Sequence, residues 1–113
     1  MTAKAMGSGE LPVYATPSMI ALMEKASREL VQPYLEEGQS TVGTRLEVSH
    51  VAASPIGAHI RAESTLVEID RRMLTFEVKA YADGELIGEG RHQRCIIYAE
   101  RFMEKALAKQ KKA

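Results

Sequence analysis

The apolar residues of this chain change their spacing near residue 40, and this change constrains the fold more than any other feature. Between Ala15 and Leu30 they recur every three or four positions, which is the period of one face of an α-helix. From Thr41 to about Tyr98 they alternate with polar residues, which is the period of a half-buried strand. The pattern predicts an α+β fold in which one long helix precedes several long antiparallel strands.

The predicted helix begins at a threonine–proline pair and carries a broad apolar arc. Thr16 suits the N-cap position and Pro17 the first helical position, while Pro33 marks the helix end. Residues 36–38 (EEG) form the exit loop, and a short first strand over residues 11–15 precedes the helix. The arc consists of Met19, Ile20, Leu22, Met23, Ala26, Ser27, Leu30 and Val31.

Four strands and a final helix complete the predicted order of elements. They span residues 41–52, 58–70, 74–82, 85–98 and 98–110. SPIG over residues 54–57 predicts the first turn, and Asp83–Gly84 is a strong hairpin signal. The alternation slips near Leu66 and Val67, which indicates a bulge.

Alternation also assigns residues to the two faces of the sheet. The inward face of the first strand holds Val42, Thr44, Leu46, Val48, His50 and Ala52. Its outward face holds Thr41, Gly43, Arg45, Glu47 and Ser49. The inward face of the third strand holds Leu74, Phe76, Val78, Ala80 and Ala82.

Short turns between consecutive strands favour a meander, in which each strand pairs with the next one along the chain. A single helix covers only one face of such a sheet, so we expect the sheet to curl around it. Residues 1–10 are small and polar and are expected to be flexible, which leaves residues 11–113 as one domain. The exposed sheet edges favour association with a second copy.

Charge and cysteine content exclude several broad classes of function. The 15 basic residues equal the 15 acidic ones, so nothing in the balance suggests a nucleic-acid-binding protein. Cys95 is the only cysteine, which rules out an internal disulfide and favours a reducing compartment. No apolar run reaches the ~18 residues of a membrane span, and the N-terminus lacks the apolar core of a signal peptide. We therefore expect a cytoplasmic protein without a membrane partner.

Three polar residues stand where they could meet one groove. Glu24 lies at the rim of the apolar arc, where it is either a surface residue paired with Arg28 or a half-buried carboxylate facing a cleft. His50 falls on the inward face of the first strand, where it is either a core histidine bonded to a backbone carbonyl or an acid/base group. Thr16 caps the helix, but its hydroxyl could also contact a ligand.

Other motifs give weaker evidence for a functional site. His59 and His92 lack the clustered spacing of a metal site, and residues 84–90 (GELIGEG) do not fit a phosphate-binding loop. Arg94 shares a predicted strand face with His92, from which its guanidinium could reach a carbonyl or phosphate group of a ligand.

Three segments of the chain carry a family resemblance. They are ATPSMIALMEKAS (15–27), PYLEEGQSTVGTRLEVSHVAASPIG (33–57) and GEGRHQRCIIYAERF (88–102). Together they resemble the hotdog-fold thioesterases, and most closely the fluoroacetyl-CoA thioesterase-like branch. The resemblance implies a long central helix wrapped by a curved antiparallel β-sheet, a short C-terminal helix, and a homodimer with its active sites at or near the subunit interface. It also implies catalytic roles for Thr16, Glu24 and His50, and substrate-binding roles for Gly43 and Arg94.

The activity implied by the resemblance is hydrolysis of a short or small acyl-CoA to a free acid and CoA. Glu24 would attack the thioester or activate water, His50 would be the acid/base group, and Thr16 would be an orienting hydroxyl. CoA enters as part of the substrate, so no metal or prosthetic group is required. In that branch a phenylalanine-bearing lid precedes the threonine, whereas GSGELPVY (7–14) has no phenylalanine, so we expect a different acyl group. The alternatives are a non-catalytic acyl-CoA or small-ligand binding module of the same fold, and a hotdog hydratase or dehydratase.

Overall fold

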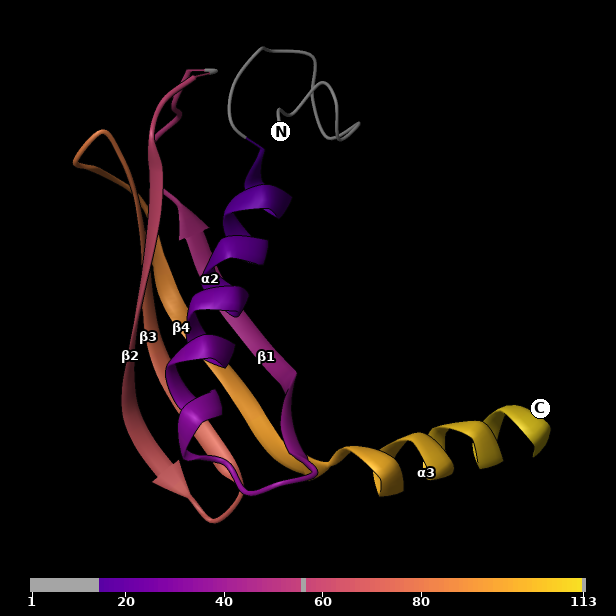
Figure 1. The fold of residues 1–113 in the computed structure, drawn as a ribbon. Coiled ribbons are helices and arrows are strands. Elements are labelled where there is room, and N and C mark those ends of the chain that lie inside the picture. The colour runs from indigo at the N-terminus through magenta and orange to yellow at the C-terminus, as the bar shows by residue number, and fades with distance from the viewer. Residues whose placement is uncertain (1–14, 56, 113) are drawn as a thin grey trace.

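The computed structural model describes residues 15–55 and 57–112, and it confirms the predicted order of a long helix, four strands and a final helix. The elements are α2 (Thr16–Val31), the 3₁₀ turn η1 (Gln32–Tyr34), β1 (Gln39–His50), β2 (Ile60–Asp70), β3 (Met73–Ala82), β4 (Glu85–Tyr98) and α3 (Ala99–Lys112). The strands form one antiparallel sheet with α2 along one face, while α3 extends away from the sheet (Figure 1). The predicted first strand, apart from Ala15, and the segment 1–10 lie outside the described residues.

The strands lie in the order β1-β4-β3-β2, so the predicted meander is wrong for β1. β2, β3 and β4 follow one another through tight turns at Arg71 and at Asp83–Gly84, whose φ angles of 56°, 48° and 87° suit short hairpins. β1 pairs with β4 instead, and residues 51–59 connect it to β2 at the far edge. A link of that length can cross the end of the sheet, whereas a two-residue turn joins only neighbouring strands.

The core lies between α2 and the face of the sheet that this helix covers. Met19 and Met23 of α2 are fully buried, as are Phe76 and Val78 at the centre of β3. Gly88 leaves space for this contact, because a Cβ at that position would overlap the sulfur of Met19. The predicted inward face of the third strand is confirmed throughout. Full burial of such a side chain contributes roughly 1.5–3 kcal/mol, so this contact fixes α2 on the sheet.

A β-bulge in β1 reverses the predicted faces of its first half. The pairing with β4 shifts between Gly43 and Arg45, which leaves Thr44 as the extra residue. Because one extra residue reverses the alternation, Thr41 is buried and Gly43 faces α2, while Thr44 is exposed. The prediction that Thr41 and Gly43 point outward and Thr44 inward is therefore wrong. Beyond the bulge, His50 lies on the inward face as predicted.

A second bulge lies in β2, where the sequence predicts it. The pairing with β3 shifts between Leu66 and Glu68. Past this point Val67 and Ile69 are exposed, and β2 forms one edge of the sheet. An edge strand with exposed apolar side chains is open to further pairing or packing.

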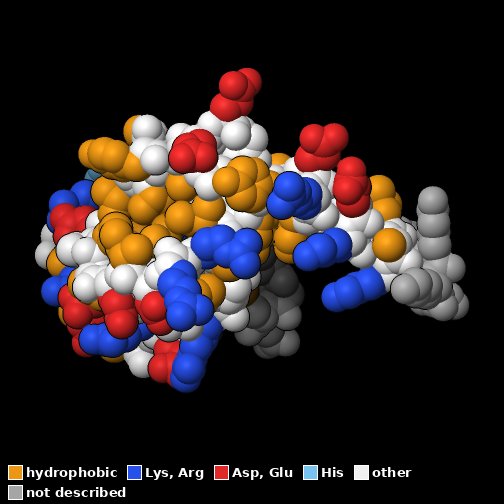
Figure 2. All heavy atoms as spheres, turned by 90° about the horizontal axis from the view of Figure 1, so that it is seen from below, with side chains coloured by type: hydrophobic (Ala, Val, Ile, Leu, Met, Phe, Trp, Pro, Cys, Tyr) orange, Lys and Arg blue, Asp and Glu red, His pale blue; other side chains and the backbone are white. Residues whose placement is uncertain are grey.

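The end of the domain at which α2 runs into η1 exposes several apolar side chains. Figure 2, viewed from this end, shows them as a group beside the projecting α3. Leu30 and Tyr34 are 41% and 86% exposed, and with Leu66 they line a hollow of about 270 Å³. The predicted apolar arc is therefore wrong in its last turn at Leu30. Phe102 and Leu107 of α3 are also exposed.

Candidate active site

Thr16 lies at the start of α2, but its side chain does not cap the helix. The N-cap residue is Ala15, whose carbonyl oxygen accepts hydrogen bonds from the backbone N–H groups of Ser18 and Met19, and no side chain caps this end. The hydroxyl oxygen of Thr16 lies 2.7 Å from Nδ1 of His50. The predicted N-cap position is therefore wrong by one residue. A hydroxyl that is not used by the helix backbone can orient the imidazole.

His50 ends β1 on its inward face and is half-buried. While Nδ1 contacts Thr16, Nε2 is buried and has no hydrogen-bond partner among the residues that the structure describes. The alternative of a core histidine satisfied by a backbone carbonyl is therefore not what the structure contains. An imidazole that is held at one nitrogen and free at the other can exchange a proton at the free nitrogen.

Glu24 is half-buried on α2, with 43% of its side chain exposed. Its Oε2 lies 3.9 Å from Nη1 of Arg94 on β4. Arg28, the surface partner considered from the sequence, belongs to none of the ion pairs formed within residues 15–55 and 57–112. The carboxylate thus faces a buried cation of the sheet instead of a neighbour on its own helix.

Arg94 reaches from β4 to β1 and is held in a defined orientation. Its Nε donates to the hydroxyl oxygen of Thr41 at 2.7 Å, and its Nη2 donates to the carbonyl oxygen of Thr41 at 2.9 Å. Only 7% of its side chain is exposed. Burial lowers the pKa of Arg94, the Glu24 carboxylate opposes this shift, and Arg28 adds to it. Because an arginine stays protonated in proteins, this group is a fixed positive charge beside Glu24.

Gly43 is the point of β1 at which these groups meet. A Cβ there would lie 3.2 Å from Cε1 of His92, 3.3 Å from Oε2 of Glu24 and 3.6 Å from Nη1 of Arg94. A glycine therefore lets the β1 backbone approach the carboxylate closely. The bulge at Thr44 turns Gly43 to this side, which is why strand alternation misplaced it.

The five candidate residues form two groups along α2. Thr16 and His50 meet at its start, while Glu24, Gly43 and Arg94 meet two turns further on. The step from residue 16 to residue 24 is about 12 Å along the helix axis. A hollow of about 310 Å³ beside the second group is lined by Ala21, Glu24, Lys25, Arg28 and Arg94. Neither Thr16 nor His50 lines this hollow, so it is not a groove that all three catalytic candidates border.

Two residues that contact Arg94 beside the second group, His92 and Thr41, were not among the candidates from the sequence. His92 is 1% exposed, with Nδ1 2.9 Å from the carbonyl oxygen of Arg45 and Nε2 3.2 Å from Nη1 of Arg94. Its position two residues before Arg94 on the same strand face was the available signal. Thr41 gave no such signal, because the bulge that turns it inward is not visible in the alternation.

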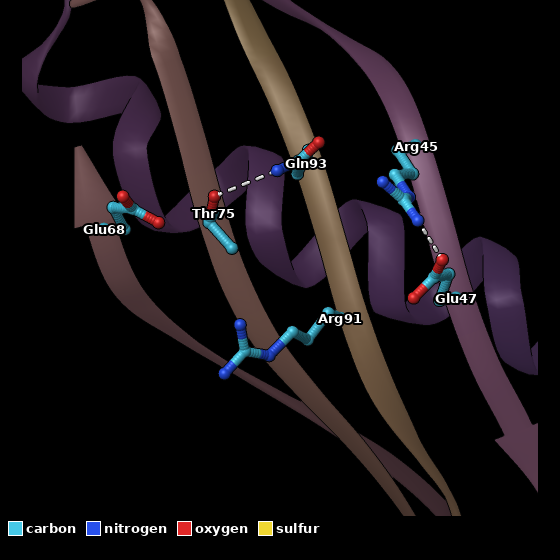
Figure 3. A pocket seen from close by; sticks show the side chains of 6 residues that line it. All are labelled: Arg45, Glu47, Glu68, Thr75, Arg91 and Gln93. Atoms are coloured by element: carbon cyan, nitrogen blue, oxygen red, sulfur yellow. Dashed lines mark hydrogen bonds and ion pairs between the residues drawn. The ribbon is translucent and has the colours of Figure 1, made fainter. Parts of the chain in front are cut away.

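A hollow on the opposite face of the sheet offers less suitable chemistry. It measures about 180 Å³ and is lined by Arg45, Glu47, Glu68, Thr75, Arg91 and Gln93 (Figure 3). Arg45 pairs with Glu47 there, and Arg91 lies 3.8 Å from Glu77. Its arginines are compensated by neighbouring carboxylates and no imidazole lines it, so we place the candidate site on the α2 face.

The described residues give no sign of a metal centre or a membrane span. Among residues 15–55 and 57–112, no group of three His, Cys, Asp or Glu side chains is placed to hold a metal ion. No helix in the same ranges is both long enough and apolar enough to cross a bilayer.

Comparison with known proteins identifies close relatives. The family model described as fluoroacetyl-CoA-specific thioesterase matches residues 1–100. A fluoroacetyl-CoA thioesterase from Streptantibioticus cattleyicolor is 37% identical over 97 residues, which are 86% of this chain and 70% of that protein. A crystal structure of a mutant fluoroacetyl-CoA-specific thioesterase in complex with fluoroacetate and CoA is 34% identical, with a TM-score of 0.87 over 96% of this chain and 89% of the other.

Two further solved structures extend the likeness. A thioesterase superfamily member from Thermus thermophilus is 33% identical, with a TM-score of 0.81 over 91% of this chain and 74% of the other. A hot-dog-like protein from Thermanaerovibrio acidaminovorans is 18% identical, with a TM-score of 0.82 over 87% of this chain and 73% of the other. These likenesses confirm the predicted hotdog fold.

Proposed function

This chain belongs to the fluoroacetyl-CoA-specific thioesterase family and is a thioester hydrolase, and we propose that it converts a short or small acyl-CoA to a free acid and CoA. The observation that carries the proposal is the family match over residues 1–100, a span that includes the hydroxyl, acid and imidazole placed along α2. Fluoroacetyl selectivity is not proposed, because GSGELPVY (7–14) has no phenylalanine. That segment lies outside the described residues.

Glu24 is the proposed nucleophile or general base. A thioester carbonyl is a good electrophile, so a carboxylate beside it can attack it or take a proton from an attacking water. The guanidinium of Arg94, which is largely buried, places a positive charge 3.9 Å from this carboxylate. Glu24 is still 43% exposed, so a substrate can reach it from the hollow.

His50 is the proposed acid/base group, and Thr16 orients it. When Nδ1 carries the proton and donates to the Thr16 hydroxyl, the lone pair of Nε2 can take a proton from water. The same nitrogen can then protonate the departing CoA thiolate. The hydroxyl of Thr16 is thus available to orient the imidazole, whereas the hydroxyl of a capping threonine would accept a hydrogen bond from a backbone N–H of the helix.

Gly43 and Arg94 form the proposed substrate-binding part of the site. Three of the five guanidinium N–H groups contact Thr41 and His92, and two are left over. These two N–H groups and the backbone beside Gly43 could stabilise the negative oxygen that forms during attack on the thioester.

We further propose that the active form is a homodimer that binds its acyl-CoA substrate at the subunit interface. The two groups of candidate residues are about 12 Å apart along α2, and a second copy would enclose the space that one chain leaves open. Lys25 and Arg28 at the rim of the hollow would attract the phosphates of CoA. We propose no metal or prosthetic group, and the cytoplasmic location stays a prediction.

The test offers the purified protein a panel of acyl-CoA substrates and follows release of free CoA thiol. Hydrolysis of small acyl-CoA esters by the wild type, and its loss in both Glu24→Gln and His50→Ala with folding intact by circular dichroism, would support the proposal. Full activity of either variant would remove that residue from the mechanism.

The rival function is a binding module that holds acyl-CoA without turning it over. It predicts saturable binding by calorimetry and no thiol release from any member of the panel. Formation of a hydrated or dehydrated acyl-CoA without thiol release would instead identify a hydratase or dehydratase.

A further inference from the structure

His92 is a buried histidine that the mechanism above does not use. It is 1% exposed on β4 and stacks on Phe76 of β3, with ring centroids 6.2 Å apart. Both of its ring nitrogens have partners, namely the carbonyl oxygen of Arg45 at 2.9 Å and Nη1 of Arg94 at 3.2 Å. A buried histidine needs a partner at each ring nitrogen, and here one of the two partners is the arginine of the candidate site.

The partners of His92 assign its protonation state. A guanidinium nitrogen can only donate, so Nε2 of His92 must accept from Nη1 of Arg94. A backbone carbonyl oxygen can only accept, so Nδ1 must carry the proton that is donated to Arg45. His92 is therefore neutral, in the single tautomer protonated at Nδ1.

The bulge in β1 makes this arrangement possible. Arg45 follows directly after the extra residue Thr44, where the regular ladder with β4 is interrupted. The Arg45 carbonyl oxygen accepts the proton of His92 from beside that interruption. The same irregularity turns Thr41 and Gly43 toward α2, so one local distortion supplies the surroundings of both His92 and Arg94.

His92 fixes the one guanidinium nitrogen that faces the catalytic acid. Thr41 holds the opposite edge of Arg94 through Nε and Nη2. Nη1 is the nitrogen that lies 3.9 Å from Oε2 of Glu24, and it is the nitrogen that His92 contacts. Because the guanidinium is planar, the Thr41 contacts restrain its plane, and His92 adds the one hydrogen bond that Nη1 itself makes among the described residues.

We propose that His92 is a positioning residue for thioester hydrolysis, which aims Nη1 of Arg94 at Glu24 by accepting one of its two protons. The proposal rests on the proposed roles of Glu24 and Arg94. His92 does not touch the reacting atoms, and it acts through the guanidinium alone.

A matched pair of substitutions separates the two contacts of the imidazole. In His92→Gln, the side-chain oxygen can occupy the place of Nε2 and still accept from Arg94. In His92→Asn, the amide N–H₂ can occupy the place of Nδ1 and still donate to Arg45, but nothing reaches Arg94. We expect kcat to fall about tenfold or more in His92→Asn and less than about threefold in His92→Gln, with KM little changed in both.

A double-mutant cycle tests whether His92 acts through Arg94. In an Arg94→Lys background, where the planar fork is already lost, His92→Asn should lower kcat by no more than about twofold further. Losses that multiply independently would overturn the proposal. So would equal kcat values for the Asn and Gln variants, both measured on protein shown to be folded.

A spectroscopic measurement keeps this proposal separate from the proposed function. Nitrogen-15 NMR of the wild type, assigned with the His92→Gln variant, should show His92 protonated at Nδ1 and unprotonated at Nε2 at neutral pH. A tautomer protonated at Nε2, or an imidazolium, would overturn the assignment even if the enzyme is active. If no acyl-CoA is hydrolysed, the proposed function fails, and this spectrum still decides whether His92 holds Arg94.

Discussion

The two groups of candidate residues along α2 are built in different ways. Thr16 and His50 meet through a single contact of 2.7 Å, and Nε2 of His50 has no partner among the described residues. The side chain of Arg94, in contrast, is only 7% exposed. It contacts Thr41 twice and His92 once, and it also faces Glu24.

The difference separates a group that can exchange protons from one that holds a charge in place. Proton transfer needs a nitrogen that can change partners, which His50 offers. A fixed positive charge needs few degrees of freedom and little water, which Arg94 has. Each group alone lacks what the other supplies, so substitutions should affect the two in different ways.

The largest effect is expected from the acid and the imidazole themselves. Glu24→Gln and His50→Ala should each lower kcat by about 1,000-fold, because each removes a proton-transfer or nucleophilic group. If the two groups act on one substrate, the double variant should be little worse than either single variant. Rates are measured by thiol release, and losses that multiply would mean that the two groups act independently.

Arg94→Met should be the most damaging change to stability. It leaves Nε2 of His92 and the hydroxyl of Thr41 buried without a partner, so we expect a loss of about 3 kcal/mol in the free energy of unfolding. Urea denaturation measures this value. The matched control is Arg91→Met on the same strand, where the side chain is 64% exposed and paired with Glu77, and it should cost less than about 0.5 kcal/mol. Equal costs would show that the second group is not rigidly held.

Thr16→Val tests the first group without a change of shape. We expect kcat to fall about tenfold because the imidazole loses its orienting hydroxyl, while Thr16→Ser should keep most of the activity. Stability should change by less than about 0.5 kcal/mol, whereas removal of a true N-cap costs about 1 kcal/mol. Thermal unfolding distinguishes the two cases. A loss of about 1 kcal/mol in Thr16→Val would mean that the hydroxyl caps the helix and does not mainly orient His50.

Gly43→Ala should have the smallest effect on the site. The new Cβ would lie 3.2 Å from His92 and 3.3 Å from Glu24, so the carboxylate must move by a few tenths of an ångström. We expect kcat/KM to fall about threefold, which corresponds to less than 1 kcal/mol. Gly38→Ala is the control, since no atom lies within 4 Å of its added Cβ and its φ of +82° affects stability alone. Unchanged kcat/KM in Gly43→Ala would mean that substrate does not pass this point.

Features of the fold that depend on local spacing could be predicted from the sequence, and the strand order could not. The inward face of β3, the bulge in β2 and the turn at Asp83–Gly84 all follow from local spacing and residue type. The place of β1 beside β4 does not, because a link such as residues 51–59 does not specify which edge its next strand will join.

The candidate site shows the same division. His50 could be placed on the inward face, and Arg94 on one face with His92, because the alternation is regular between Leu46 and His50 and between His92 and Arg94. Gly43 and Thr41 could not, because the extra residue Thr44 reverses their faces. The helical wheel left Glu24 either as a surface residue paired with Arg28 or as a half-buried carboxylate facing a cleft, and its contact with Arg94 on the sheet decided between them.

The helix, the four strands, the core of β3 and the residue types needed for thioester hydrolysis follow from the amino-acid sequence, because they depend on the period of the apolar residues and on side-chain chemistry. Only the folded structure shows that Arg94 faces Glu24, that His92 contacts Arg94, and that Thr16 contacts His50. The first and third pairs lie far apart in sequence, and the second brings together two residues of β4 whose side chains also contact Arg45 and Thr41 of β1. All three contacts therefore form only after the bulge and the strand order are in place. Contacts of that kind depend on register and topology, which no local pattern of residues encodes.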